Sequence, residues 1–180
     1  MEKDRQATTP PAEPGTLMSR IECPNTQGVR FLRMQKIEFG PHLYTYEEHG
    51  GTGVPATALN VAEHQVVKTL VMETDQRKAL LVLMHGDCEV STKQLARVIG
   101  AKRVEPCSAP VAERVTGYVF GGTSPFGTRT KLPVYVEKTI FDLTKIFING
   151  GKRGFLVEID PRDLHRAVPV TEVEVAISRS

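Results

Sequence analysis

Hydrophobic runs of strand length, separated by short polar links, dominate the chain from residue 66 onward. The runs 66–72 and 80–84 flank the polar turn 73–78, and this spacing predicts a β-hairpin. Further runs with β-branched or aromatic residues predict strands over 42–46, 104–107, 134–137, 145–148 and 155–159. The expected strands therefore outnumber the helices between them.

Helical spacing and capping residues predict several short helices. Asn25 or Thr26 is a candidate N-cap for a helix that Gly40-Pro41 would end. Further helices are expected over 56–63, between Ser91 and Gly100, from Ser108 to about residue 115, and from Pro161. Most links are too short for right-handed crossovers between parallel strands. We therefore expect an α/β fold of the mixed α+β kind, with a mixed, curled sheet flanked by helices.

The two ends of the chain follow different patterns. Residues 1–25 are rich in Pro, Glu, Thr and Arg and hold few large hydrophobic groups, so we expect a disordered extension there. Residues 168–180 alternate hydrophobic and polar positions, which is typical of an added edge strand but also compatible with a loose tail. A length of 180 residues favours a single domain, which would span residues 26–167.

Composition and charge exclude several classes of protein. The net charge of only +2 gives no global field that demands nucleic acid, although basic residues cluster at 102–103, 129–131 and 152–153. The three cysteines are far apart and lack metal-binding spacing, so we expect free thiols, no metal and a cytoplasmic protein. No hydrophobic run has the length of a membrane span, and we expect no membrane association.

The candidate chemistry lies in two glycine-rich stretches and one lysine. Residues 121–127 could hold a small polar group against bare backbone N–H groups, with Ser124 as the one reactive side chain, or could form a simple turn. Residues 149–154 form a second glycine-rich turn beside two cations. Lys68 interrupts a hydrophobic strand, where an ammonium needs a partner or a solvent-lined pocket unless it reaches solvent from an edge strand.

No familiar nucleophile or metal motif accompanies these stretches. The five histidines are scattered without metal spacing or a nucleophile elbow, and we expect structural or surface roles for them. Ser124 is therefore not expected to act as a triad nucleophile, and Cys88 and Cys107 are expected to be packing groups. A phosphate-binding P-loop is a poor fit because no Gly-Lys-Ser/Thr follows a strand at the required spacing.

Five segments together resemble the YbaK-like proteins and the prolyl-tRNA-synthetase-associated editing domains. They are VKTLV (67–71), ARVIGAKRVE (96–105), TGYVFGGTSPFG (116–127), LPV (132–134) and INGGKRG (148–154). Their order and spacing extend the resemblance over about 26–167. It implies a single domain with a β-barrel-like sheet, no cofactor, and a trans-editing hydrolase that clears mischarged tRNA. The implied substrates are Cys-tRNA(Pro) or Ala-tRNA(Pro), and prolyl-tRNA synthetase is a candidate partner.

The resemblance also assigns roles to individual residues. Lys68 would hold the 3′-terminal adenosine or its phosphate, while the amides of Gly121 and Gly122, together with Ser124, would surround the aminoacyl carbonyl. The other implied substrate contacts are Tyr46, Thr69, Thr123, Pro125, Phe126, Gly127, Asn149, Gly150 and Gly151. The tRNA backbone would meet Lys102, Arg103, Arg129, Lys131, Lys152 and Arg153. Water, the terminal ribose hydroxyl or the substrate's own thiol could complete the reaction.

Two alternatives stay open at this level. Thr69 looks more like the cysteine-editing branch of the family, whereas the short loop 47–55 and Leu156 depart from many cysteine-specific relatives, so the amino acid removed is not fixed. The chain could also be a non-catalytic module that binds an adenylate-like ligand or a synthetase, because fold does not dictate function. The presence of Lys68 with both glycine-rich stretches favours the enzyme.

Overall fold

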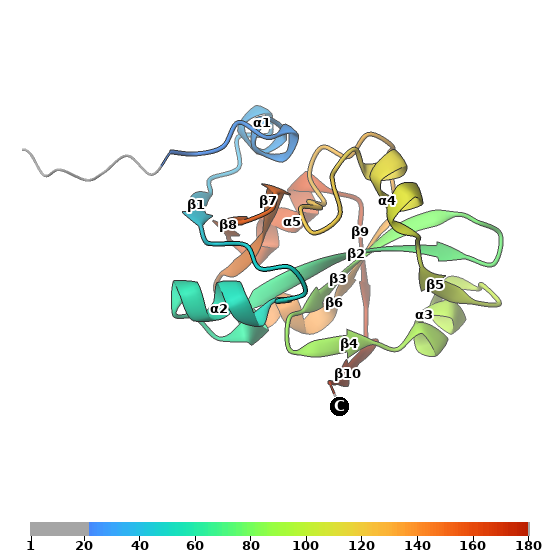
Figure 1. Ribbon diagram of the computed structural model, residues 1–180. Helices are drawn as coiled ribbons and strands as arrows, with labels where there is room; N and C mark the ends of the chain where they lie inside the picture. Colours follow the sequence, from blue (N-terminus) through green and yellow to red (C-terminus); the bar gives the residue numbers. More distant parts are fainter. Residues whose placement is uncertain (1–21, 180) are drawn as a thin grey trace, which may run out of the picture.

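The hydrophobic runs assemble into an eight-stranded mixed sheet (Figure 1). The computed structural model describes residues 22–179, so the expected extension 1–25 lies, up to residue 21, outside the described residues. The order along the sheet is β1 (Gly40–Leu43), β8 (Phe155–Ile159), β7 (Ile146–Lys152), β2 (Val66–Thr74), β3 (Ala79–His85), β6 (Val134–Glu137) and β9 (Val170–Val173). The expectation of a single mixed α/β domain is confirmed.

This sheet contains both parallel and antiparallel pairs. The predicted hairpin is present, since β2 and β3 pair antiparallel from Val67↔His85 to Glu73↔Ala79. β2 pairs parallel with β7, and β6 lies parallel to both β3 and β9. β5 (Val104–Pro106) pairs with the end of β2, while β4 (Cys88–Val90) and β10 (Ala176–Ser178) form a separate two-stranded sheet.

One edge of β2 is left uncovered in the middle of the sheet. On that edge β7 pairs only with Val66 and Val67, and β5 pairs only from Met72 onward. The stretch 68–71 between them therefore has no strand on that side within residues 22–179. Because the Val71 carbonyl accepts the N–H of Cys107 at 3.0 Å, alternation along the strand turns the backbone groups of Thr69 toward the same gap. Lys68 consequently lies on a central strand, not on an edge strand.

Short helices cover the sheet and close its connections. They are α1 (Gln27–Met34), α2 (Gly53–Leu59), α3 (Thr92–Ile99), α4 (Ala109–Thr116) and α5 (Leu164–Ala167), with 3-10 turns η1 (Glu63–Gln65), η2 (Lys138–Asp142) and η3 (Pro161–Asp163). Two predicted caps are confirmed, since the Thr26 hydroxyl accepts the Val29 N–H at 3.0 Å and Ser91 caps α3. Ser108 stands at the N-cap position of α4 but its side chain forms no capping hydrogen bond. No helix within residues 22–179 has the length and hydrophobicity to cross a bilayer.

Several predicted boundaries differ from the structure, among them the strand expected over 42–46, which is β1 at Gly40–Leu43. α1 ends at Met34 because Lys36 takes a left-handed φ of 55°, so Gly40 and Pro41 belong to β1, an edge strand that tolerates a missing N–H. α2 spans 53–59 and ends before residue 63, because Asn60 adopts a left-handed φ of 54°. Asn149 to Lys152 lie within β7, although the glycines had predicted a turn there.

Candidate functional site

A cavity of about 620 Å³ opens beside the uncovered edge of β2. Segments far apart in the sequence supply its walls: the loop after β1, the start of α2, β2 itself, the end of β5, the first glycine-rich stretch and β7. Seven of the predicted site residues line it, namely Tyr46, Lys68, Thr69, Gly121, Thr123, Asn149 and Arg153. The fold thus brings a large part of the predicted set to one place.

Lys68 is half-buried in the cavity wall and donates from Nζ to the backbone carbonyl of Cys88 on β4. Burial lowers the pKa of the Lys68 ammonium, and the nearby Arg179 lowers it further, against the opposing effect of Glu89. Lys68 forms no ion pair with a carboxylate in the part of the chain described. A half-buried cation without an anionic partner is suited to receive an anionic ligand.

Thr69 lines the same cavity, but its hydroxyl is buried beside it. Its Oγ1 is buried and is the one buried side-chain polar atom within residues 22–179 that has no hydrogen-bond partner. A buried hydroxyl without a partner is unfavourable by about 1–3 kcal/mol. Because Oγ1 is not accessible from the cavity, the part of Thr69 that a ligand could reach is its backbone on the open edge of β2.

The first glycine-rich stretch meets the cavity through Gly121 and Thr123. Gly121 has a φ of +83°, and a Cβ placed on it would lie 2.8 Å from the Tyr46 hydroxyl, so only glycine fits. Arg153 stands over the Tyr46 ring at 5.2 Å and donates from Nε to the Phe120 carbonyl at 2.8 Å. The N–H groups of Gly121 and Thr123 form no hydrogen bond within residues 22–179, whereas that of Gly122 donates to Val119.

The second glycine-rich stretch forms the opposite part of the wall. Asn149 donates from Nδ2 to the Gly121 carbonyl at 3.3 Å and accepts the Gly151 N–H on Oδ1 at 2.7 Å. A Cβ on Gly150 would lie 2.3 Å from the Phe155 ring. Gly150 and Gly151 therefore do not line the cavity but allow Asn149 to bind the facing loop.

The rest of the first glycine-rich stretch points into the core. Ser124 is fully buried, its hydroxyl accepts the Phe126 N–H at 3.2 Å, and Gly28 of α1 packs against it. Phe126 is also fully buried, and its carbonyl accepts the Tyr118 hydroxyl. Gly122, Pro125 and Gly127 also lie outside the cavity lining. These residues set the shape of the loop, and the Ser124 hydroxyl lies away from the cavity.

The sequence interpretation did not find the part of the cavity wall next to β5. Met72, Pro106, Cys107 and Ala112 line it, and they come from β2, the end of β5 and α4. Burial raises the pKa of Cys107 to about 11, so this side chain is a neutral thiol. The only sequence signal was that β5 ends in Pro106-Cys107 next to a helix start, which does not by itself reveal a cavity wall.

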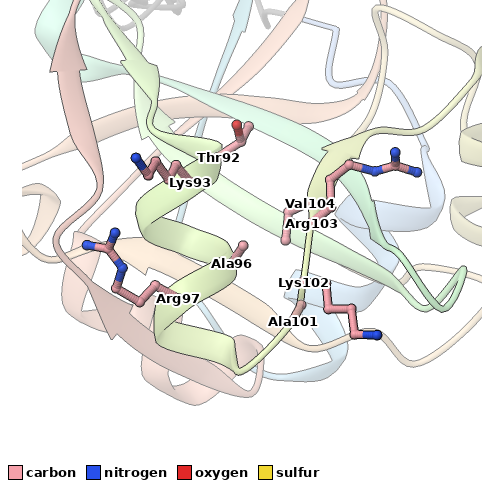
Figure 2. A pocket seen from close by; sticks show the side chains of 8 residues that line it. All are labelled: Thr92, Lys93, Ala96, Arg97, Ala101, Lys102, Arg103 and Val104. Atoms are coloured by element: carbon pink, nitrogen blue, oxygen red, sulfur yellow. The ribbon is translucent and has the colours of Figure 1, made fainter.

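A second hollow, of about 460 Å³, lies between α3 and the link to β5 and is flanked by basic residues (Figure 2). The charged ends of Lys93 and Arg97 on α3 point away from it on one side, and those of Lys102 and Arg103 on the link point away on the other side. Only Arg103 is paired, with Glu105 at 3.3 Å, among the ion pairs of residues 22–179. We call this hollow, together with the four cations beside it, the α3 groove. The other predicted backbone contacts, Arg129, Lys131 and Lys152, are exposed elsewhere on the surface.

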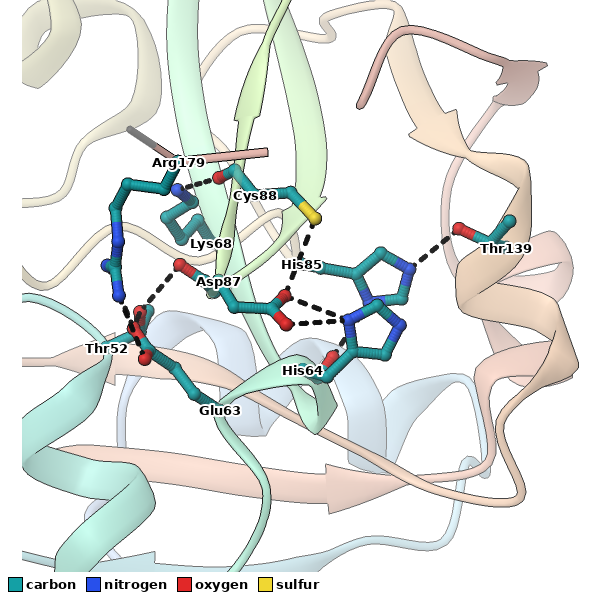
Figure 3. A network of polar contacts seen from close by, with 10 residues as sticks. Thr52, Glu63, His64, Lys68, His85, Asp87, Cys88, Thr139 and Arg179 are labelled. Atoms are coloured by element: carbon teal, nitrogen blue, oxygen red, sulfur yellow. Dashed lines mark hydrogen bonds and ion pairs between the residues drawn. The ribbon is translucent and has the colours of Figure 1, made fainter. Parts of the chain in front are cut away.

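A polar network lies behind Lys68 (Figure 3). His64 Nδ1 contacts Asp87 Oδ1 at 2.8 Å, and Cys88 Sγ lies 3.5 Å from the same oxygen. These three side chains could offer metal-binding atoms, all within 4.8 Å of one another. The His64–Asp87 hydrogen bond already satisfies two of them, and burial keeps Cys88 a neutral thiol by raising its pKa. We assign no metal to this network, and the expected absence of a metal stays a prediction.

The family comparison identifies an editing domain. The profile of the aminoacyl-tRNA editing domain family matches residues 53–167, and the chain belongs to this family. It is 28% identical over 137 residues to an Enterococcus faecalis protein that carries the provisional name Cys-tRNA(Pro)/Cys-tRNA(Cys) deacylase EbsC, covering 76% of this chain and 84% of that protein.

Relatives also occur inside a larger enzyme. The chain is 30% identical over 107 residues to the proline–tRNA ligase of Streptococcus equi subsp. equi, a match that covers 59% of this chain but only 17% of the ligase. Among solved structures, one described provisionally as a trans-editing enzyme for prolyl-tRNA synthetase superposes with a TM-score of 0.73 at 18% identity, covering 86% of this chain and 96% of that one. At this identity the likeness shows the fold alone.

Proposed function

We propose that this protein hydrolyses the ester bond of mischarged aminoacyl-tRNA in trans, with Cys-tRNA(Pro) or Ala-tRNA(Pro) as substrate. The observation that carries the proposal is one cavity lined by the ammonium of Lys68, which has no ion-pair partner, by the open edge of β2 at Thr69, and by Gly121 and Thr123, whose N–H groups form no hydrogen bond within residues 22–179. The kinship to an Enterococcus protein named as a Cys-tRNA(Pro)/Cys-tRNA(Cys) deacylase supports the choice of substrates.

The groups in the cavity suit the two ends of an aminoacyl ester. Lys68 binds the terminal phosphate or adenosine and orients the ester. The N–H groups of Gly121 and Thr123 stabilise the negative charge that develops on the carbonyl oxygen when water adds to it. The C–O bond then breaks, the ribose oxygen leaves and takes up a proton, and free amino acid and tRNA result. Tyr46 and Asn149 hold the loop that carries these N–H groups.

The cavity wall next to β5 is the proposed contact for the amino acid. Met72, Cys107 and Ala112 offer hydrophobic or weakly polar surface there, whereas the charged side chains of the lining come from other segments. Leu156 adds a hydrophobic side chain to the same lining. A small side chain such as a methyl or thiol group fits such a surface better than a charged one. This chemistry agrees with alanine or cysteine as the residue that is removed.

The α3 groove is the proposed contact for the tRNA backbone. It shares β5 with the cavity, because Val104 lines the groove and Pro106 lines the cavity. Lys93, Arg97 and Lys102 have no ion-pair partner within residues 22–179, so they are available to phosphates. Four cations give modest affinity, and prolyl-tRNA synthetase is the proposed source of additional tRNA binding.

The test is release of labelled amino acid from Cys-tRNA(Pro), Ala-tRNA(Pro) and Pro-tRNA(Pro). We expect one mischarged species to be cleaved and Pro-tRNA(Pro) to be spared. Lys68→Ala should reduce the rate by about 100-fold or more, while Lys78→Ala, which changes an exposed lysine on the β2–β3 turn, should leave it unchanged. If no species is cleaved above the uncatalysed rate even with synthetase added, the enzyme proposal fails and a binding module takes its place.

A further inference from the structure

The C-terminal segment, which follows the part matched by the family, returns to the editing cavity. β10 pairs antiparallel with β4, and Ser178 lies opposite Cys88, the residue whose carbonyl receives Lys68. The buried carboxylate of Glu137 accepts the N–H groups of Val175 and Ala176 at 2.8 and 2.9 Å. These contacts fix the path of the chain up to the end of β10.

Arg179 follows β10 and forms a two-pronged contact with Glu63 (Figure 3). Nη1 and Nη2 each lie 3.1 Å from one oxygen of the Glu63 carboxylate. Such bidentate pairs have a defined geometry as well as a favourable energy. Glu63 Oε1 also accepts the hydroxyl of Thr52 at 2.7 Å, and Thr52 lines the cavity together with Lys68.

Glu63 and Lys68 belong to one group of polar side chains (Figure 3): Thr52, which binds Glu63, lines the cavity with Lys68, and Cys88, which binds Lys68, lies on the β4–β10 sheet just before Arg179. Burial and Arg179 lower the pKa of the Lys68 ammonium, whereas Glu89, Cys88 and Glu63 raise it. Lys68 nevertheless donates to a backbone carbonyl and not to Glu63, whose oxygens are occupied by Arg179 and Thr52. Without Arg179, the carboxylate of Glu63 would be unpaired, and its electrostatic attraction to the Lys68 ammonium would favour a direct contact between the two.

We propose that Arg179 is a positioning residue of the editing site. By occupying Glu63, it keeps the ammonium of Lys68 free for the anionic 3′ end of the substrate and holds Thr52 in the cavity wall. This inference rests on the proposed function for its kinetic consequences. It goes beyond the family pattern, because Arg179 lies outside the matched residues 53–167.

The kinetic test compares single and double variants. Arg179→Ala should raise KM by about tenfold with a smaller change in kcat, because substrate must displace Glu63 from Lys68. Adding Glu63→Gln should return KM to within about threefold of wild type, since the competing charge is gone. Arg179→Lys should give an intermediate KM. Arg162→Ala, which removes an exposed bidentate pair with Asp160 outside the cavity lining, should leave KM unchanged.

A second readout does not require activity. The pKa of the Lys68 ammonium, followed by NMR on lysine labelled at Cε, should rise in Arg179→Ala, because a neighbouring cation is lost and Glu63 is freed. An unchanged KM and pKa in Arg179→Ala, or a KM that Glu63→Gln does not restore, would overturn the inference. If wild type cleaves no substrate, the proposed function fails, while the NMR comparison still decides the role of Arg179.

Discussion

The cavity beside Lys68 and the α3 groove differ in how the chain builds them. The groove is lined by residues 92–104, a single helix and the link that follows it. The cavity draws its lining from positions between 44 and 156, and its chemistry depends on contacts such as Asn149 to Gly121. A site that aims N–H groups at a reacting carbonyl needs exact placement, whereas phosphate attraction needs only local charge. The two hollows should therefore respond differently to small and large changes.

The largest effect after loss of Lys68 itself is expected from one methyl group at Gly121. In Gly121→Ala the new Cβ would meet the Tyr46 hydroxyl at 2.8 Å, and the φ of +83° disfavours alanine by about 1–2 kcal/mol. We expect kcat/KM to fall by at least about 30-fold, because the N–H groups of the loop move. Steady-state hydrolysis of the preferred mischarged tRNA measures this.

Gly100→Ala is the matched control for the groove. Gly100 caps α3 with a φ of +73°, but nothing lies within 4 Å of the place that a Cβ would take, so the same backbone cost comes without a clash. The melting temperature should fall by about 2–4 °C per kcal/mol in both variants. Only Gly121→Ala should lose activity. Equal losses of activity would mean that general destabilisation, not loop geometry, explains the Gly121 result.

A smaller effect is expected in the groove, and it takes reversal of two charges to produce it. Arg97→Glu combined with Lys102→Glu should raise KM about tenfold at low salt and leave kcat unchanged, since neither residue lines the cavity. The slope of log KM against log salt concentration should decrease by about 2. Lys36→Glu, at an exposed site just after α1, serves as the control. A fall in kcat with unchanged KM would contradict a role in backbone binding.

Much of the fold could be predicted because local signals agreed with each other. The run 134–137 became β6 with the same bounds, and Ser91 and Gly100 bound α3 as expected. The errors arose where tertiary contacts overrode a local signal. Asn149-Gly150-Gly151 reads as a turn, yet β8 pairs with the strand and Phe155 fills the space that a Cβ on Gly150 would need.

The site could be predicted only in part, for the same reason. Lys68 stands out in the sequence as a charge in a hydrophobic strand, and the structure places it in the cavity. Ser124 also stands out, but its burial against Gly28 of α1 cannot be read from the loop alone. Met72 and Cys107 carry no distinctive pattern, and they meet only because β5 pairs with β2. The sequence pattern also gives no sign of the role of Arg179, since its partner Glu63 is far away along the chain.

The last prediction concerns the fall of activity at alkaline pH. It has almost no effect on the rate at neutral pH, but it distinguishes the cavity from the groove most directly. Burial and Arg179 hold the pKa of Lys68 below the ordinary value of a lysine, so the ammonium is lost earlier as pH rises. Three other groups in or near the cavity stay protonated longer, because burial raises the pKa of Tyr44 and brings those of Cys107 and Tyr118 to about 11 and about 12.

Lys68 is therefore the cavity group expected to set the alkaline limb of kcat/KM. Activity should be almost constant near neutral pH and then fall about tenfold per pH unit above the lowered pKa, after subtraction of uncatalysed ester hydrolysis. Lys68→Arg, which keeps its charge at alkaline pH, should lose this limb even if its overall rate is lower. The α3 groove should contribute no such limb, since Arg97→Glu with Lys102→Glu leaves the ionisation of Lys68 unaltered. An alkaline limb that persists in Lys68→Arg would assign it to a group other than Lys68.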